Sequence, residues 1–174
     1  HLPSALPAQR ELSDMLLQHL SQQTDAYRLD GSKLLCLPGE FTAEIGGEEP
    51  LWNSSLWIAD DLVIMEKVAG TYCLTAASLC SPSHWRLEDK FGRSMREIHD
   101  PIPGFHQQHT PKIDRFFEHL RPQTPVLRFN RSVQAYDSLK QHPDHRVELC
   151  ATTPLYYRTE RQSLTRLPLT GAIA

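Results

Sequence analysis

The sequence lacks the features that would predict a membrane segment or a disulfide framework. No apolar stretch approaches the roughly 20 residues that a membrane-spanning helix needs, and the N-terminal segment has no signal-peptide core. The four cysteines contain no CxxC pair, so neither a zinc knuckle nor a set of disulfides is predicted. We therefore expect a soluble, cytoplasmic protein with free thiols and no membrane partner.

Runs of like charge are also missing. The 174 residues contain 18 basic and 21 acidic side chains, which gives a formal net charge of −3. No basic stripe or block of like charges predicts a nucleic-acid partner. No internal repeat or low-complexity segment is present either. The expected partner is a small ligand or another protein.

The chain length predicts one domain, or one domain with a helical appendage. In residues 7–22, apolar side chains recur at helical spacing and predict an amphipathic helix that packs outside the main core. These side chains are Leu12, Met15, Leu16 and Leu20. We assign residues 1–30 to an N-terminal helical extension and residues 31–174 to the main domain, which we expect to be truncated at its C-terminus.

The order of the remaining segments predicts an α+β domain. Strands come first, helices lie in the middle and strands return, which suits one antiparallel sheet that covers central helices, with a cavity between the layers. Ala69–Gly70 is the predicted hairpin turn. A central helix is predicted to begin at Thr110–Pro111, since threonine caps helices and proline suits their first turn. Its predicted buried face consists of Ile113, Phe116, Phe117 and Leu120. The predicted strands cover residues 34–37, 56–67, 72–80, 126–133, 147–151 and 156–167.

The segment before Pro101 contains the most informative histidine. If this segment is helical, Phe91, Met95 and Ile98 form an apolar stripe. His99 lies four residues after Met95 and therefore shares that face. Pro101 disfavours helical geometry at the residue before it, so His99 would stand in the last turn and lean into a cavity. A neutral imidazole there can bind a heme iron, or it can merely satisfy a hydrogen bond at the helix end.

Other ligands remain open. His84 lies in a proline-rich turn beside Trp85 and is either a rival ligand or a surface histidine. His106 and His109 have the spacing of a metal pair, but no third ligand has a clear place near them. Cys80 could offer a thiolate, yet its place at a strand end favours a small buried thiol.

Several short motifs, taken in their order along the chain, resemble one known family. They are Asp61-Leu62 to Met65, Ala76 to Trp85, Lys90 to Arg93, Ile98 to Gly104, Asp114 to Phe117, Arg128 to Asn130 and Glu160 to Pro168. Together they cover roughly residues 55–171. In this order they resemble the heme-dependent oxidative N-demethylase alpha-subunit family.

The resemblance implies a PAS-like fold that encloses heme b, with His99 of the Ile-His-x-Pro motif as the iron ligand. It implies Trp85, Met95 and Phe91 as further cofactor-binding residues. It also implies that O2 oxidises a small secondary amine such as dimethylamine. Electrons would come from NADPH through a separate reductase subunit that carries FMN and a [2Fe–2S] cluster, because no motif for those cofactors occurs in this sequence.

On the oxygen side of the heme, the chemistry requires donors that polarise dioxygen and a carboxylate that can hold a protonated amine. The candidates are Glu160, Arg161 and Arg166 in the last strand region, with Arg128 on the strand before it. A solvated sheet face is the alternative for each of them. Since neighbouring strand residues point to opposite faces, Glu160 and Arg161 cannot both face the pocket without a bulge.

Two other functions fit the same residues: a heme-based gas or redox sensor, and a degenerate scaffold subunit that has lost heme. Three positions depart from the family's pattern. His84 stands where arginine is usual, Ser81 where an aromatic residue is usual, and Arg131 where tryptophan is common. These departures bear on the identity of the substrate more than on heme binding.

Overall fold

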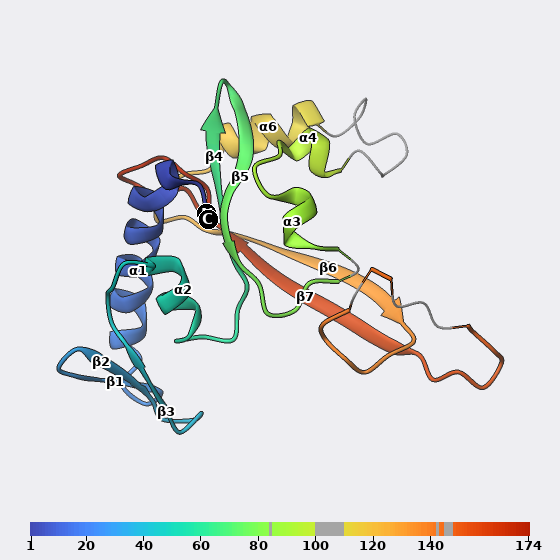
Figure 1. Ribbon diagram of the computed structural model, residues 1–174, viewed down its shortest axis with the longest axis horizontal. Helices are drawn as coiled ribbons and strands as arrows, with labels where there is room; N and C mark the ends of the chain where they lie inside the picture. Colours follow the sequence, from blue (N-terminus) through green and yellow to red (C-terminus); the bar gives the residue numbers. More distant parts are fainter. Residues whose placement is uncertain (84, 100–109, 142, 145–147) are drawn as a thin grey trace.

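A computed structural model describes residues 1–83, 85–99, 110–141, 143–144 and 148–174, and Figure 1 shows their arrangement. The described residues form an α+β protein, as predicted, with three separate antiparallel sheets. The sheets are β1 (Tyr27–Asp30) with β2 (Lys33–Cys36) and β3 (Phe41–Glu44), β4 (Leu62–Val68) with β5 (Thr71–Ser78), and β6 (Val126–Gln134) with β7 (Tyr156–Leu164). These ranges do not join into one sheet, so the PAS-like fold stays a prediction.

The N-terminal helix belongs to the main core. α1 (Leu6–Ser21) follows a short 3-10 turn and confirms the helix predicted from the apolar spacing. Its Ala8 and Leu12 are buried in one cluster with Ile64 of β4 and Ala76 of β5. The expectation that this helix packs outside the core is therefore wrong.

The β4–β5 hairpin forms the middle of the molecule (Figure 1). Its predicted turn is confirmed, and Ala69 and Gly70 both have a positive φ, 48° and 88°. β4 begins later than predicted because a helix, α2 (Pro50–Ser55), and a turn occupy the residues before it. The C-terminal segment returns to this hairpin, where Met65 and Ile173 exchange backbone hydrogen bonds of 2.8 and 2.9 Å.

Among the described residues after the hairpin, the helices are α3 (Leu87–Lys90), α4 (Met95–Ile98) and α6 (Thr110–His119). The single helix that the apolar stripe predicts around Met95 does not form, because Gly92 has a φ of 75° and Ser94 is extended. α6 begins where predicted, and Phe117 is buried against Tyr72 with ring centroids 5.0 Å apart. Phe116 is exposed, contrary to the prediction, because it lies about 100° round the helix from the buried Phe117.

The β6–β7 ribbon projects away from α1, α2 and the three-stranded sheet (Figure 1). Its register pairs Val126 with Leu164 and continues without a shift to Gln134 and Tyr156. The strand predicted over 147–151 does not form at residues 148–151, and Val147 lies outside the described residues. In the part of the chain that the structure describes, no helix has the length and apolar character needed to cross a bilayer.

Candidate functional site

His99 lies at the C-cap of α4, where the helix itself orients its half-buried ring. The ring Nδ1 lies 2.9 Å from the carbonyl oxygen of Met95. Because a carbonyl oxygen only accepts, Nδ1 is the donor of this hydrogen bond. Metal-binding histidines use the same arrangement, with one ring nitrogen donating to a carbonyl or carboxylate and the other facing the metal. The donor chemistry of His99 therefore fits a heme-iron ligand.

A capping box fixes the short helix that carries this histidine. The Ser94 hydroxyl accepts from the Glu97 backbone N–H at 3.3 Å, and the Glu97 carboxylate accepts from the Ser94 backbone N–H at 2.8 Å. The hydrogen bonds from Ser94, the backbone one first, lower the pKa of Glu97. Met95 and Ile98 pack against the buried cluster of the β4–β5 hairpin and α6, which holds the helix that ends at His99.

Of the other predicted cofactor-binding residues, Met95 lies on α4 four residues before His99, and its own cofactor-binding role stays a prediction, whereas Phe91 and Trp85 lie outside that helix. Phe91 is half buried in the turn between α3 and α4. Trp85 is half buried before α3, and the Nζ of Lys90 lies 4.6 Å from the centroid of its ring in a cation–π contact. Burial lowers the pKa of Lys90. The cofactor-binding roles of Phe91 and Trp85 stay predictions.

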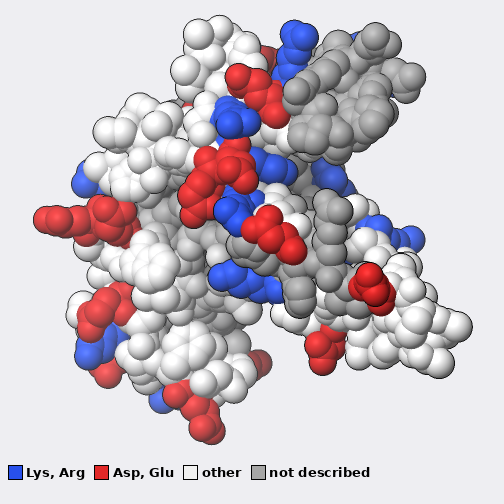
Figure 2. Space-filling model, turned by 45° about the vertical axis from the view of Figure 1, so that its right-hand side comes forward, with Lys and Arg blue, Asp and Glu red and all other residues white. Residues whose placement is uncertain are grey.

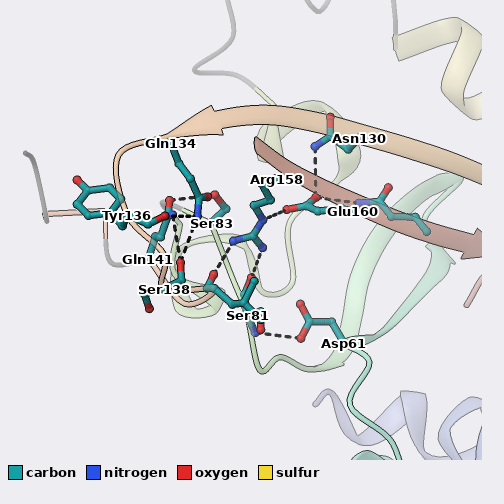
Figure 3. Close-up of polar contacts among 12 residues, drawn as sticks. Asp61, Ser81, Ser83, Asn130, Gln134, Tyr136, Ser138, Gln141, Arg158 and Glu160 are labelled. Carbon is teal, nitrogen blue, oxygen red and sulfur yellow. Dashed lines mark hydrogen bonds and ion pairs between the residues drawn. The ribbon is translucent and has the colours of Figure 1, made fainter. Parts of the chain in front are cut away.

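Glu160 and Arg161 lie on opposite faces of β7, as the alternation along a strand requires. Glu160 pairs with Asn130 across the ribbon and is half buried, whereas Arg161 is exposed. Figure 3 shows Glu160 within a group of polar side chains. Its Oε1 accepts from the Nε of Arg158 at 2.8 Å, and its Oε2 accepts from the Nδ2 of Asn130 at 3.3 Å.

Arg158 is the centre of this polar group and is only 9% exposed. Besides Glu160, its guanidinium donates to the carbonyls of Leu139 and Ser81, the latter at 2.8 Å (Figure 3). Asp61 holds the same loop, since its Oδ1 accepts from the backbone N–H of Ser81 at 3.2 Å. The buried arginine is thus compensated by a carboxylate and two carbonyls, which is the condition for burying a charge.

Arg166 lies beyond β7, and its guanidinium joins three segments of the chain. It donates to Leu120 at 3.0 Å and to Gly171 at 3.1 Å, both through their carbonyl oxygens. It also donates to the Phe117 carbonyl and the Tyr72 hydroxyl. Two of these acceptors lie at the C-terminal end of α6, where a cation is favoured. These contacts give Arg166 a structural role, and its catalytic role stays a prediction.

The predicted catalytic residues do not converge on one point. Arg128 is exposed on the Glu160 face of the ribbon, Arg161 lies on the opposite face and Arg166 at its base. Cys80 is exposed rather than buried, because it lies in the loop that Asp61 holds at the surface. The rival ligands His84, His106 and His109 lie outside the described residues.

A cavity of about 410 Å³ lies away from these residues. Its lining comes from α1, α2, the end of β5 and α3, and includes Gln9, Glu49, Trp52, Ser78 and Leu87 but none of the predicted site residues. Gln9 is 1% exposed, and its Nε2 has no hydrogen-bond partner among the described residues. Within the same ranges, no group of three or more His, Cys, Asp or Glu side chains could hold a metal ion, a result that does not bear on a single-histidine heme ligand.

Two features escaped prediction from the sequence. The joining role of Arg158 and Asp61 has no local signal, because their partners come from distant parts of the chain. The start of α4, in contrast, does have a local sequence signal. The spacing Ser94-x-x-Glu97 is a capping-box pattern that marks a helix beginning at Met95.

The fold and the site define an α+β domain that carries a half-buried histidine at the end of a short capped helix. The family described as haem-dependent oxidative N-demethylase, alpha subunit-like, matches residues 1–174, and the chain belongs to this family. The match confirms the resemblance seen in the separate motifs. A search of the curated proteins finds no match.

Proposed function

We propose that the chain binds heme b through His99 and acts as the oxygen-handling subunit of an oxidative N-demethylase. The family's description supports haem dependence and this class of reaction. The observation that carries the proposal is the His99 ring, which is half buried and has its Nδ1 held by the Met95 carbonyl at 2.9 Å. Bound heme would supply the redox chemistry by which dioxygen oxidises an N-methyl group.

The polar group around Glu160 is the proposed site for the protonated amine. A half-buried carboxylate attracts an ammonium more strongly than an exposed one, because less water screens the pair. Its Oε1 already accepts a 2.8 Å hydrogen bond from Arg158, whereas Oε2 has longer contacts, 3.3 Å to Asn130 and 3.4 Å to Gln162. We therefore expect a small secondary amine such as dimethylamine to approach Oε2.

The electron supply belongs to a partner in this proposal. The family's description as alpha subunit-like supports a complex of more than one subunit. NADPH, FMN and a [2Fe–2S] cluster are proposed for a separate reductase subunit, from which electrons would pass to the heme of this chain.

The proposal is tested by comparing two histidines that make the same backbone contact. The Nδ1 of His119 lies 2.6 Å from the Arg115 carbonyl at the end of α6, but His119 is exposed. We expect His99→Ala to lose the absorption spectrum of histidine-ligated heme and His119→Ala to keep it. Added imidazole should restore the spectrum in His99→Gly.

Formaldehyde release from dimethylamine, with a chemical or protein reductant, then tests the reaction. A His99→Ala protein that keeps the wild-type spectrum would show that the iron ligand is another residue. Heme binding without formaldehyde release would contradict the enzymatic half of the proposal and favour a sensor.

A further inference from the structure

We propose that one face of the β6–β7 ribbon is a docking surface for an acidic protein. Its occupant is the electron-donating subunit of the proposed function, on which this inference rests. Alternate residues of the two strands point to this side of the ribbon. We call it the Phe129 face and define it by Leu127, Phe129, Arg131 and Val133 of β6 and Tyr157 and Arg161 of β7.

The Phe129 face is apolar and open to solvent. Phe129 is 56% exposed, Val133 63% and Tyr157 66%. A two-stranded ribbon is at best marginally stable in water, and an exposed apolar patch of this kind marks an interaction site in a soluble protein. Figure 2 shows the end of the projecting arm as a mainly uncharged lobe, whereas acidic and basic side chains lie mixed over the body of the molecule. We therefore expect a binding partner to bury this face.

The charge of the ribbon indicates what kind of partner would bind this face. β6 and β7 contain four arginines and one glutamate, a net charge of +3, within a chain of net charge −3. The rest of the chain therefore carries −6. Arg131 and Arg161 lie on the Phe129 face, both are exposed, and no described carboxylate lies within ion-pairing distance of either. An apolar centre beside two unpaired cations is complementary to an acidic surface that has an apolar centre of its own.

A second copy of the chain fits this face less well. A symmetric pair would gather Arg131 and Arg161 of both copies in one interface, and like charges brought together in an interface are unfavourable. The residue types instead match those enriched at the centres of interfaces between different proteins, which are phenylalanine, tyrosine and arginine. Encounters between redox partners use small surfaces of this kind, and charge steers their association.

The test uses an acidic plant-type [2Fe–2S] ferredoxin as the probe. Its affinity for the protein is measured by fluorescence anisotropy, and the rate at which the reduced ferredoxin reduces the heme is measured by stopped-flow absorbance. We expect Arg131→Glu/Arg161→Glu to weaken binding and slow reduction by about tenfold or more, and Phe129→Ser to weaken binding by about fivefold. Arg28→Glu on β1 is the control, because it reverses an exposed charge outside the ribbon. It should change the affinity for ferredoxin and the rate of heme reduction by no more than about twofold.

Several outcomes would overturn the inference. The first is that the wild-type protein does not bind ferredoxin. The second is that neither the paired substitution nor its milder form Arg131→Gln/Arg161→Gln changes binding. The third is that the wild-type protein sediments as a dimer and that Phe129→Ser dissociates this dimer. Dithionite separates this inference from the proposed function, because it reduces heme without a docking surface. A protein that has no heme yet binds ferredoxin through the Phe129 face would contradict the proposed function alone.

Discussion

At the residue scale, the environment decides what an arginine does. Arg158 and Arg166 are held by carbonyl, carboxylate and hydroxyl oxygens from distant segments, whereas Arg128 and Arg161 extend from an open ribbon. The sequence shows only that arginines recur on a strand. It could not separate a structural arginine from a functional one, because the acceptors that distinguish them belong to other parts of the chain.

Replacing Arg166 tests this distinction. We expect Arg166→Met to lower the free energy of unfolding by about 2 kcal/mol or more, because carbonyls at the end of α6 and at Gly171 lose charged hydrogen bonds. Arg161→Met is the matched control on the exposed face and should change that energy by less than about 0.5 kcal/mol. Urea unfolding followed by circular dichroism measures both. Equal stability of the two variants would show that the Arg166 contacts contribute nothing.

At the element scale, the turn signal at Ala69–Gly70 is a better guide than the apolar stripe around Met95. The hairpin turn at Ala69–Gly70 is found where predicted, because the chain must reverse between two strands. The apolar stripe that ends at Ile98 suggests one helix, yet Gly92 breaks it and Ser94 starts a new one. The predicted histidine still reaches the end of a helix, since the residues from Met95 onward keep their spacing.

The β4–β5 turn gives a prediction that is independent of function. Ala69 has a φ of 48°, a conformation that asparagine tolerates better than alanine, so Ala69→Asn should raise the free energy of unfolding by about 0.5–1 kcal/mol. Gly70→Ala should lower it by about 1 kcal/mol through backbone strain alone, because no atom lies within 4 Å of the added methyl group. Thermal unfolding measures both variants. A stabilised Gly70→Ala protein would mean that the turn differs from the one described.

At the scale of the whole molecule, the two ends of the chain meet in one core. Leu167 and Ala172 lie in the same buried cluster as Ala8 and Leu12 of α1. The class of fold could be predicted from the order of strands and helices, but the packing of α1 could not, because it depends on contacts with Ala172 and its neighbours at the far end of the sequence. The division at residue 30 stays a prediction, and it can be tested.

Substitution of Glu11 tests whether the chain divides at residue 30. Glu11 is 6% exposed on α1, and its carboxylate accepts from the backbone N–H of Leu169 and of Thr170, the latter at 2.8 Å. Glu11→Ala leaves those donors without their partner and should lower the free energy of unfolding by about 1–3 kcal/mol. Asp14→Ala, an exposed position on the same helix, should change it by less than about 0.5 kcal/mol.

The shape of the urea unfolding curve distinguishes one cooperative unit from a separate N-terminal extension. If α1 and the C-terminal segment form one cooperative unit, tryptophan fluorescence and circular dichroism will report one coincident transition in both variants, shifted to lower urea only in Glu11→Ala. If residues 1–30 are a separate extension, the Glu11→Ala curve will split, with a first step that loses helix signal alone. The second outcome would support the domain boundary drawn from the sequence, and the first would place α1 inside the domain that holds His99.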